Sequence, residues 1–194
     1  MRVLELFSGT GSVGKVCRAK GYTVVSLDIN GKADINCDIM DWQYEWYDKN
    51  SFDIIWASPD CTQYSKAKTR GVRDIEGANR LVLRTLDIIN HFDPQYWFIE
   101  NPQTGLLKSQ PFMTDLPFVD ADYCMYGKSY RKRTRFWTNL SETKLNMCNK
   151  KCGSFVNGRH VGSCGNGRKK YTDKAYSRNE KYEIPEGLLK VLIP

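Results

Sequence analysis

The chain has 194 residues, a formal net charge of +7, 41% hydrophobic residues and 26% charged residues. This length supports one domain with a core of its own, and the composition excludes a disordered or fibrous chain. No apolar run approaches the roughly 20 residues of a membrane-spanning helix, so we expect no membrane partner.

The positive charge is concentrated toward the C-terminus. Residues 128–181 hold 15 Lys and Arg against 3 Asp and Glu, whereas residues 1–127 hold 13 against 17. Such a patch beside an acidic body indicates a polyanionic partner, most simply nucleic acid. Seven cysteines, an odd number, indicate a reducing compartment. Because the first residues already have a strand pattern, we expect no signal peptide and an intracellular protein.

The first elements predict a nucleotide-type βαβ unit. Residues 2–6 form an apolar strand, a glycine-rich turn follows, and the apolar residues after it have helical spacing. Gly9, Gly11 and Gly14 match GxGxxG, which is a weak signal alone. A second strand at 22–27 ends at Asp28, whose carboxylate could accept hydrogen bonds from a ribose diol. An NAD oxidoreductase and an S-adenosylmethionine (SAM) enzyme are both open at this point.

A second acid and an aromatic stretch follow. Asp38 could accept a hydrogen bond from an adenine amino group, or it could cap a helix that begins near Met40. The aromatic residues within 42–47 predict a surface helix whose aromatic face packs against the core.

The next strand, at 52–57, leads directly to a cysteine in a polar loop. Pro59 ends the strand, Cys61 follows, and Lys and Arg side chains stand at 66, 68, 70 and 73. Cations beside a thiol favour the thiolate, which is the nucleophilic form, so we expect Cys61 to ionise more easily than a free cysteine. A packed structural cysteine is the alternative.

The rest of the chain predicts the other half of an α/β sheet. We expect a helix at 77–92 and a strand at 96–99 that ends at Glu100, which lies at the carboxyl edge where open α/β folds bind ligands. Strands at 118–126 and 134–138, joined by a basic turn, form an antiparallel pair typical of SAM-dependent methyltransferases. Residues 140–180 are polar and basic, and a short helix at 184–193 closes the chain.

The strand ends together resemble the cytosine-5 DNA methyltransferases, especially short phage- or virus-type members. The resemblance is carried by the segment Leu6 to Gly11, by Ser58-Pro59-Asp60-Cys61 in place of Pro-Pro-Cys, by Glu100-Asn101-Pro102 in place of Glu-Asn-Val, and by Arg133-Thr134-Arg135.

The resemblance implies a fold, a reaction and a set of site residues. The fold class would be α/β, a Rossmann-like SAM-dependent methyltransferase fold with a small basic target-recognition insertion. The Cys61 thiolate would add to C6 of cytosine, Glu100 would hold N3 and the exocyclic amine, and Arg133 or Arg135 would orient the base. The residues implied for SAM are Phe7, Ser8, Gly9, Thr10, Gly11, Asp28, Ile29, Asp38, Ile39 and Pro59.

We expect three parts: a SAM-binding catalytic domain at 1–139, a target-recognition segment at 140–180 and a closing helix within 181–194. The segment contains Cys148, Cys152, His160 and Cys164, a set of donors that tetrahedral zinc accepts. A bound zinc would supply folding free energy that this segment cannot obtain from a core. Unrelated thiols and a surface histidine are the alternative. The cations expected to contact DNA are Arg159, Arg168, Lys169 and Lys170.

These patterns predict a monomeric enzyme that transfers methyl groups from SAM to C5 of cytosine in double-stranded DNA, with the cytosine flipped out of the helix. Methylation of cytosine in RNA is an alternative in the same enzyme class. A third reading is a degenerate fold that only binds nucleic acid or SAM, which the presence of both Cys61 and Glu100 disfavours.

Overall fold

The computed structural model describes residues 1–163 and 176–194. A seven-stranded sheet has the order β3-β2-β1-β4-β5-β7-β6, and a two-stranded hairpin forms a second sheet. The strands are β1 (Arg2–Leu6), β2 (Thr23–Asp28), β3 (Ile35–Asn36), β4 (Ile54–Ala57), β5 (Tyr96–Pro102), β6 (Phe118–Asp122), β7 (Arg133–Thr138), β8 (Phe155–Val156) and β9 (Arg159–His160).

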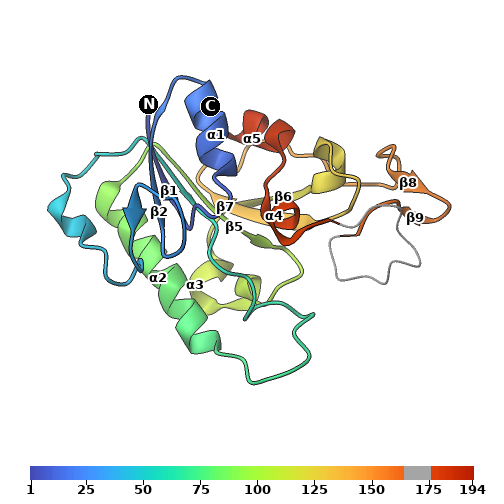
Figure 1. Ribbon diagram of the computed structural model, residues 1–194, viewed down its shortest axis with the longest axis horizontal. Coiled ribbons are helices and arrows are strands. Elements are labelled where there is room, and N and C mark those ends of the chain that lie inside the picture. Colours follow the sequence, from blue (N-terminus) through green and yellow to red (C-terminus); the bar gives the residue numbers. More distant parts are fainter. Residues whose placement is uncertain (164–175) are drawn as a thin grey trace.

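Helices cover both faces of the large sheet (Figure 1). The α-helices are α1 (Ser12–Ala19), α2 (Ile75–Phe92), α3 (Pro111–Thr114), α4 (Arg178–Tyr182) and α5 (Glu186–Leu192). Three 3-10 turns are η1 (Tyr44–Trp46), η2 (Leu107–Ser109) and η3 (Tyr123–Tyr126). In the described ranges, no helix is long and apolar enough to cross a membrane.

The strands are apolar on both sides because each face packs against helices. On one face Leu4, Ile55 and Ile99 pack with α2. On the other face, Val3 and Trp56 pack with α1 and α5, which lie side by side in Figure 1. Two buried layers therefore hold β1, β4 and β5 rigidly in the middle of the sheet.

β1 to β5 pair in parallel, and β7 then runs antiparallel between β5 and β6. The expected antiparallel pair at one side of a parallel sheet is confirmed. This reversal places the beginning of β7 at the same edge as the carboxyl end of β5, since Pro102 pairs with Thr134.

Two predicted elements differ in detail. The aromatic stretch 42–47 forms only the 3-10 turn η1 rather than a helix, and Trp42 and Tyr44 are buried in the core beside Phe92. The strand predicted at 118–126 ends at Asp122, where η3 begins. β-Branched and aromatic residues favour a strand by local propensity, but in these segments tertiary packing determines the secondary structure.

Candidate active site

The register of the sheet brings the polar strand ends together. Leu6 is the partner of Leu27 on one side and of Ala57 on the other, and Ala57 is the partner of Ile99. The residues that follow these four therefore lie at one edge of the parallel part of the sheet. They are Phe7, Asp28, Ser58 and Glu100.

The turn after β1 is open and glycine-dependent. Phe7, Gly9 and Gly11 have positive φ angles of 56°, 47° and 65°. A Cβ atom on Gly11 would meet no atom within 4 Å, so its glycine serves the backbone conformation and leaves space in front of the turn. The exposed Thr10 and the half-buried Ser8 complete the turn.

Asp28 fixes this turn from the end of β2. Its carboxylate accepts hydrogen bonds from Gly9 N and Asn30 N, both at 2.8 Å. The neighbouring Ile29 is 61% exposed, so an apolar surface lies beside the acid. The open turn, the acid and this surface suit a nucleoside, and the expected SAM residues 7–11, 28 and 29 adjoin one another.

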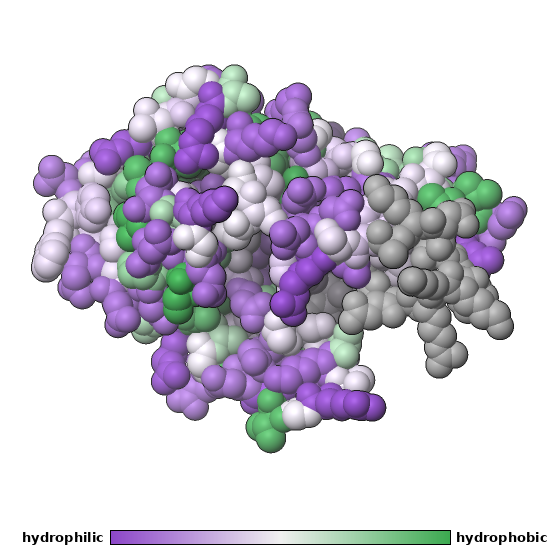
Figure 2. Space-filling view, in the orientation of Figure 1, coloured by the Kyte–Doolittle hydropathy of each residue, from purple (hydrophilic) through white to green (hydrophobic). Residues whose placement is uncertain are grey.

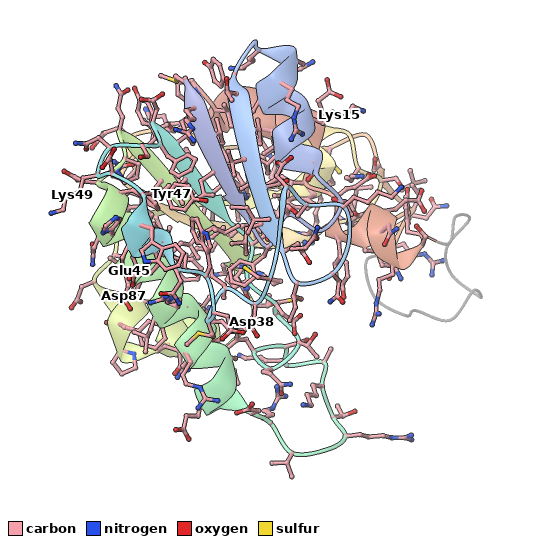
Figure 3. The ribbon with its side chains drawn as sticks, turned by 60° about the vertical axis from the view of Figure 1, so that its left-hand side comes forward. Lys15, Asp38, Glu45, Tyr47, Lys49 and Asp87 are labelled. Atoms are coloured by element: carbon pink, nitrogen blue, oxygen red, sulfur yellow. The ribbon has the colours of Figure 1, made fainter. Side chains whose placement is uncertain are left out.

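Asp38 lies beyond β3, below the carboxyl ends of β1 and β2 in Figure 3. One of its oxygens accepts a hydrogen bond from Met40 N at 2.9 Å, so it stabilises a local turn. The Ile39 side chain is buried in the core, and only its backbone remains for a ligand. Of this pair, Asp38 is the better candidate to contact an adenine.

The cysteine loop is anchored to β5. Pro59 is buried, and its carbonyl accepts a hydrogen bond from Asn101 Nδ2 at 3.0 Å. Asn101 directly follows Glu100, so this bond ties the loop of Cys61 to the strand that carries the acid. The Asn101 Oδ1 atom is buried without a hydrogen-bond partner among the described residues.

The expectation that Cys61 ionises easily is wrong for the free protein. Burial, followed by the charges of Glu100 and Asp60, raises the pKa of the Cys61 thiol to about 11. Two of the loop cations, Lys68 and Arg73, make their hydrogen bonds within the loop itself. Arg73 donates to the carbonyls of Gln63, Ser65 and Lys68, and Lys68 Nζ donates to Gln63 Oε1 at 2.6 Å.

Lys132 is the cation that acts on this site, and the sequence analysis missed it. Its Nζ lies 3.6 Å from Glu100 Oε1 and lowers the pKa of Cys61. Glu100 is only 7% exposed, and its Oε1 also accepts a hydrogen bond from Tyr123 OH at 3.4 Å. The position of Lys132 directly before the Arg-x-Arg pattern was the one signal in the sequence.

The two candidate arginines lie in different surroundings. Arg133 contacts Asp122 and lines the cleft above Cys61. Arg135 instead makes a paired contact with Asp120 at 2.8 and 2.9 Å, and its guanidinium lies 3.3 Å from the Phe118 ring. It is not among the described residues that line the cleft, so it stabilises the β6–β7 pair.

A cleft of about 1000 Å³ opens over Cys61. Its described lining contains six cations and no acid, and Figure 2 shows a hydrophilic surface around α4 on this face. The cations are Lys68, Arg131, Lys132, Arg133, Arg178 and Lys181. An electropositive cleft with a thiol inside suits a polyanion that carries the reacting group.

A second cluster, of cysteine and histidine side chains, lies at η3, the turn that follows β6. The donor atoms of Cys124, Cys148, Cys152 and His160 all lie within 4.8 Å of one another. Cys124 was not predicted as a member, because it lies 24 residues before Cys148, the first of the other three along the chain. Cys164 lies outside the described residues, as do Arg168, Lys169 and Lys170, whereas Arg159 is exposed on β9. Three thiols and an imidazole are a donor set that zinc accepts.

Comparison with known proteins agrees with this geometry. The profile of the family "C-5 cytosine-specific DNA methylase" matches residues 1–111. A protein of Frog virus 3 (isolate Goorha), named "Probable DNA (cytosine-5)-methyltransferase", is 33% identical over 100% of this chain and 99% of its own length.

Two solved structures share the fold. The Entamoeba histolytica methyltransferase EhMeth matches with a TM-score of 0.57 and 16% identity over 76% of this chain and 55% of that one. The S. pombe Dnmt2 methyltransferase matches with a TM-score of 0.51 and 19% identity over 71% and 48%. The chain spans about half the length of these structures.

The sheet order and these structures define a SAM-dependent methyltransferase fold, as predicted. Within that class, the chain belongs to the C-5 cytosine-specific DNA methylase family, the family of DNA (cytosine-5)-methyltransferases. The curated relative is viral, which agrees with the resemblance to short phage- or virus-type members.

Proposed function

We propose that this protein transfers a methyl group from SAM to C5 of cytosine in double-stranded DNA, through a covalent bond between Cys61 Sγ and C6 of the base. The observation that carries the proposal is that Cys61 and Lys132 line one cationic cleft, with Glu100 buried 3.6 Å from Lys132, at the sheet edge that also carries the turn at 7–11. A base in a duplex exposes its edges but not its face, so the cytosine must be flipped out to reach Cys61.

Glu100 and Cys61 are coupled through one proton. N3 of cytosine offers only a lone pair, so Glu100 must carry a proton to donate a hydrogen bond there. A protonated Glu100 also removes the negative charge that raises the pKa of Cys61. Lys132 near both groups favours the thiolate electrostatically. Base binding that protonates Glu100 would therefore generate the nucleophile where it is needed.

The covalent bond changes the reactivity of the ring. Addition of Cys61 Sγ to C6 moves electron density to C5, which becomes nucleophilic. SAM, held by the turn at 7–11 and by Asp28, supplies the methyl group when bound. A base then removes the C5 proton, and the electron pair of that C–H bond expels the Cys61 thiolate from C6 and restores the aromatic ring.

A methyl-transfer assay with tritiated SAM tests the proposal. Duplex DNA, an RNA of the same sequence and an oligonucleotide without cytosine are compared, alone and in competition. We expect incorporation into DNA, and its loss in both Cys61→Ser and Glu100→Gln with SAM affinity retained. Equal incorporation by wild type and Cys61→Ser would refute the role of Cys61, and a preference for the RNA would refute DNA as the substrate.

A further inference from the structure

We propose that Cys124, Cys148, Cys152 and His160 bind one structural zinc ion, and that this ion fixes the turn that positions Glu100 and the cleft arginines. The catalytic consequence rests on the proposed function, but the metal site itself does not. Cys124 is the new and decisive ligand because it belongs to η3, next to the catalytic residues, whereas the other three belong to the C-terminal segment.

The spacing of the donor atoms fits tetrahedral zinc. Zinc binds thiolate sulfur at about 2.3 Å and imidazole nitrogen at about 2.0 Å, so a tetrahedral site separates sulfur from nitrogen by roughly 3.5 Å. His160 Nε2 lies 3.4 Å from Cys148 Sγ and 3.3 Å from Cys152 Sγ. All four donor atoms lie within 4.8 Å of one another.

The local backbone is shaped to bring the ligands together. Lys150, between two of the cysteines, has a φ of 71°, and its amide donates to Cys148 Sγ at 3.3 Å. Asn157 and Gly158 have φ angles of 50° and 82°, as in a tight two-residue hairpin turn, which aims His160 back at the cysteines. Backbone N–H donors to a ligating sulfur and a rigid hairpin are common supports of a metal site.

The cluster is joined to the active site by three consecutive residues. Asp122 is fully buried, contacts Arg131 and Arg133, and accepts a hydrogen bond from Cys148 N at 2.8 Å. Tyr123 OH contacts Glu100, and Lys132 Nζ lies 4.9 Å from the Tyr123 ring centre. Cys124 then enters the cluster.

The hairpin β8–β9 projects from the large sheet in Figure 1, and neither of its strands belongs to the two buried apolar clusters of the described residues. A metal shared between η3 and the hairpin would supply the missing attachment. The ion would thus join the segment expected to recognise DNA to the turn that carries the catalytic contacts.

Metal analysis of untagged, full-length protein tests the ligand set. We expect about one zinc per chain, as one four-ligand site requires. Cys124→Ser should lose most of it, whereas Cys164→Ser and the control Cys37→Ser should keep it. A zinc-free wild type, or loss of zinc from Cys164→Ser but not from Cys124→Ser, would overturn the proposal.

If Cys124→Ser does not fold, Cys152→Ser tests the same ligand set. Cys152 lies half-buried in a loop outside both apolar cores, so its substitution should leave the fold intact. Substitution with cobalt gives a second readout. The sulfur-to-cobalt charge-transfer band should have the intensity of three thiolates in wild type and of two in Cys152→Ser. An unchanged band in this variant would contradict the assignment.

Hydrogen exchange tests the link to the active site. Removing zinc from the intact protein should speed exchange in the peptide 122–133, where Tyr123 N donates to Lys132 O, and leave β1 and β4 protected. Exchange that is unchanged at 122–133 would refute the positioning role. Zinc binding without methyl transfer would instead count only against the proposed function.

Discussion

At the residue scale, the reactivity of Cys61 is set by its burial and by the charges around it. A thiol with a pKa near 11 is almost wholly protonated at neutral pH. In the free protein, the Cys61 thiol therefore neither attacks other molecules readily nor is readily modified by them. Glu100 and Asp60 act against ionisation, and Lys132 acts for it. Activation must therefore come from what binds in the cleft.

Alkylation by iodoacetamide, followed on the Cys61 peptide by mass spectrometry, checks these charges. Glu100→Gln removes the repulsion and should lower the pKa of Cys61, so alkylation at mildly alkaline pH should accelerate by up to about tenfold. Methyl transfer should fall in the same variant. Lys132→Met should slow alkylation. Identical pH profiles in wild type and Glu100→Gln would show that the two groups are not coupled.

At the scale of elements, β1 and α1 are joined by a buried acid. Glu5 Oε2 accepts a hydrogen bond from Gly14 N at 2.9 Å, and a Cβ on Gly14 would lie 2.6 Å from that oxygen. Gly14 thus leaves free the space that the Glu5 carboxylate and the Arg18 guanidinium occupy. Burial raises the pKa of Glu5 from 4.5 to about 7, against the effect of the Gly14 and Val13 amides.

Glu5 should make stability depend on pH. Because its folded pKa is the higher one, its contribution is complete below about pH 4.5 and is lost as the pH rises through about 7. Relative to Glu5→Gln, the free energy of unfolding of wild type should fall by roughly 3 kcal/mol across this window, at 1.36 kcal/mol per pKa unit. Denaturant titrations at several pH values measure it, and parallel curves for the two proteins would contradict the assignment.

The central elements could be predicted because each is encoded locally. The apolar strands lead to Asp28, Cys61 and Glu100, and the parallel register then places these residues at one edge without further information. Cys124 and Lys132 lie just outside β6 and β7, and their positions depend on how these two strands pair. A one-residue change of register turns every side chain of a strand to the other face of the sheet, so sequence spacing alone could not assign Lys132 to Glu100.

At the scale of the whole molecule, the acidic body and the basic C-terminal stretch meet at the cleft. Binding of DNA there should release counterions, so the logarithm of the binding constant should fall linearly with the logarithm of the salt concentration. Lys181→Gln, in the cleft lining, should weaken binding and reduce the slope by about one.

Lys49→Gln provides the matched control, because Lys49 is exposed at the edge of the molecule, away from the cleft (Figure 3). It removes the same charge and should leave the slope unchanged. Equal effects of the two substitutions would show that only net charge matters, and that the cleft is not the binding surface.

The most direct test of the proposed function is covalent trapping on duplex DNA that contains 5-fluorocytosine. Fluorine at C5 cannot leave as a proton does, so the bond between Cys61 and C6 should persist after methyl transfer. We expect a SAM-dependent adduct that survives denaturation, with the modified base on the Cys61 peptide, and none in Cys61→Ser. Methylation of unmodified DNA without a trapped adduct, or an adduct on another cysteine, would contradict the account.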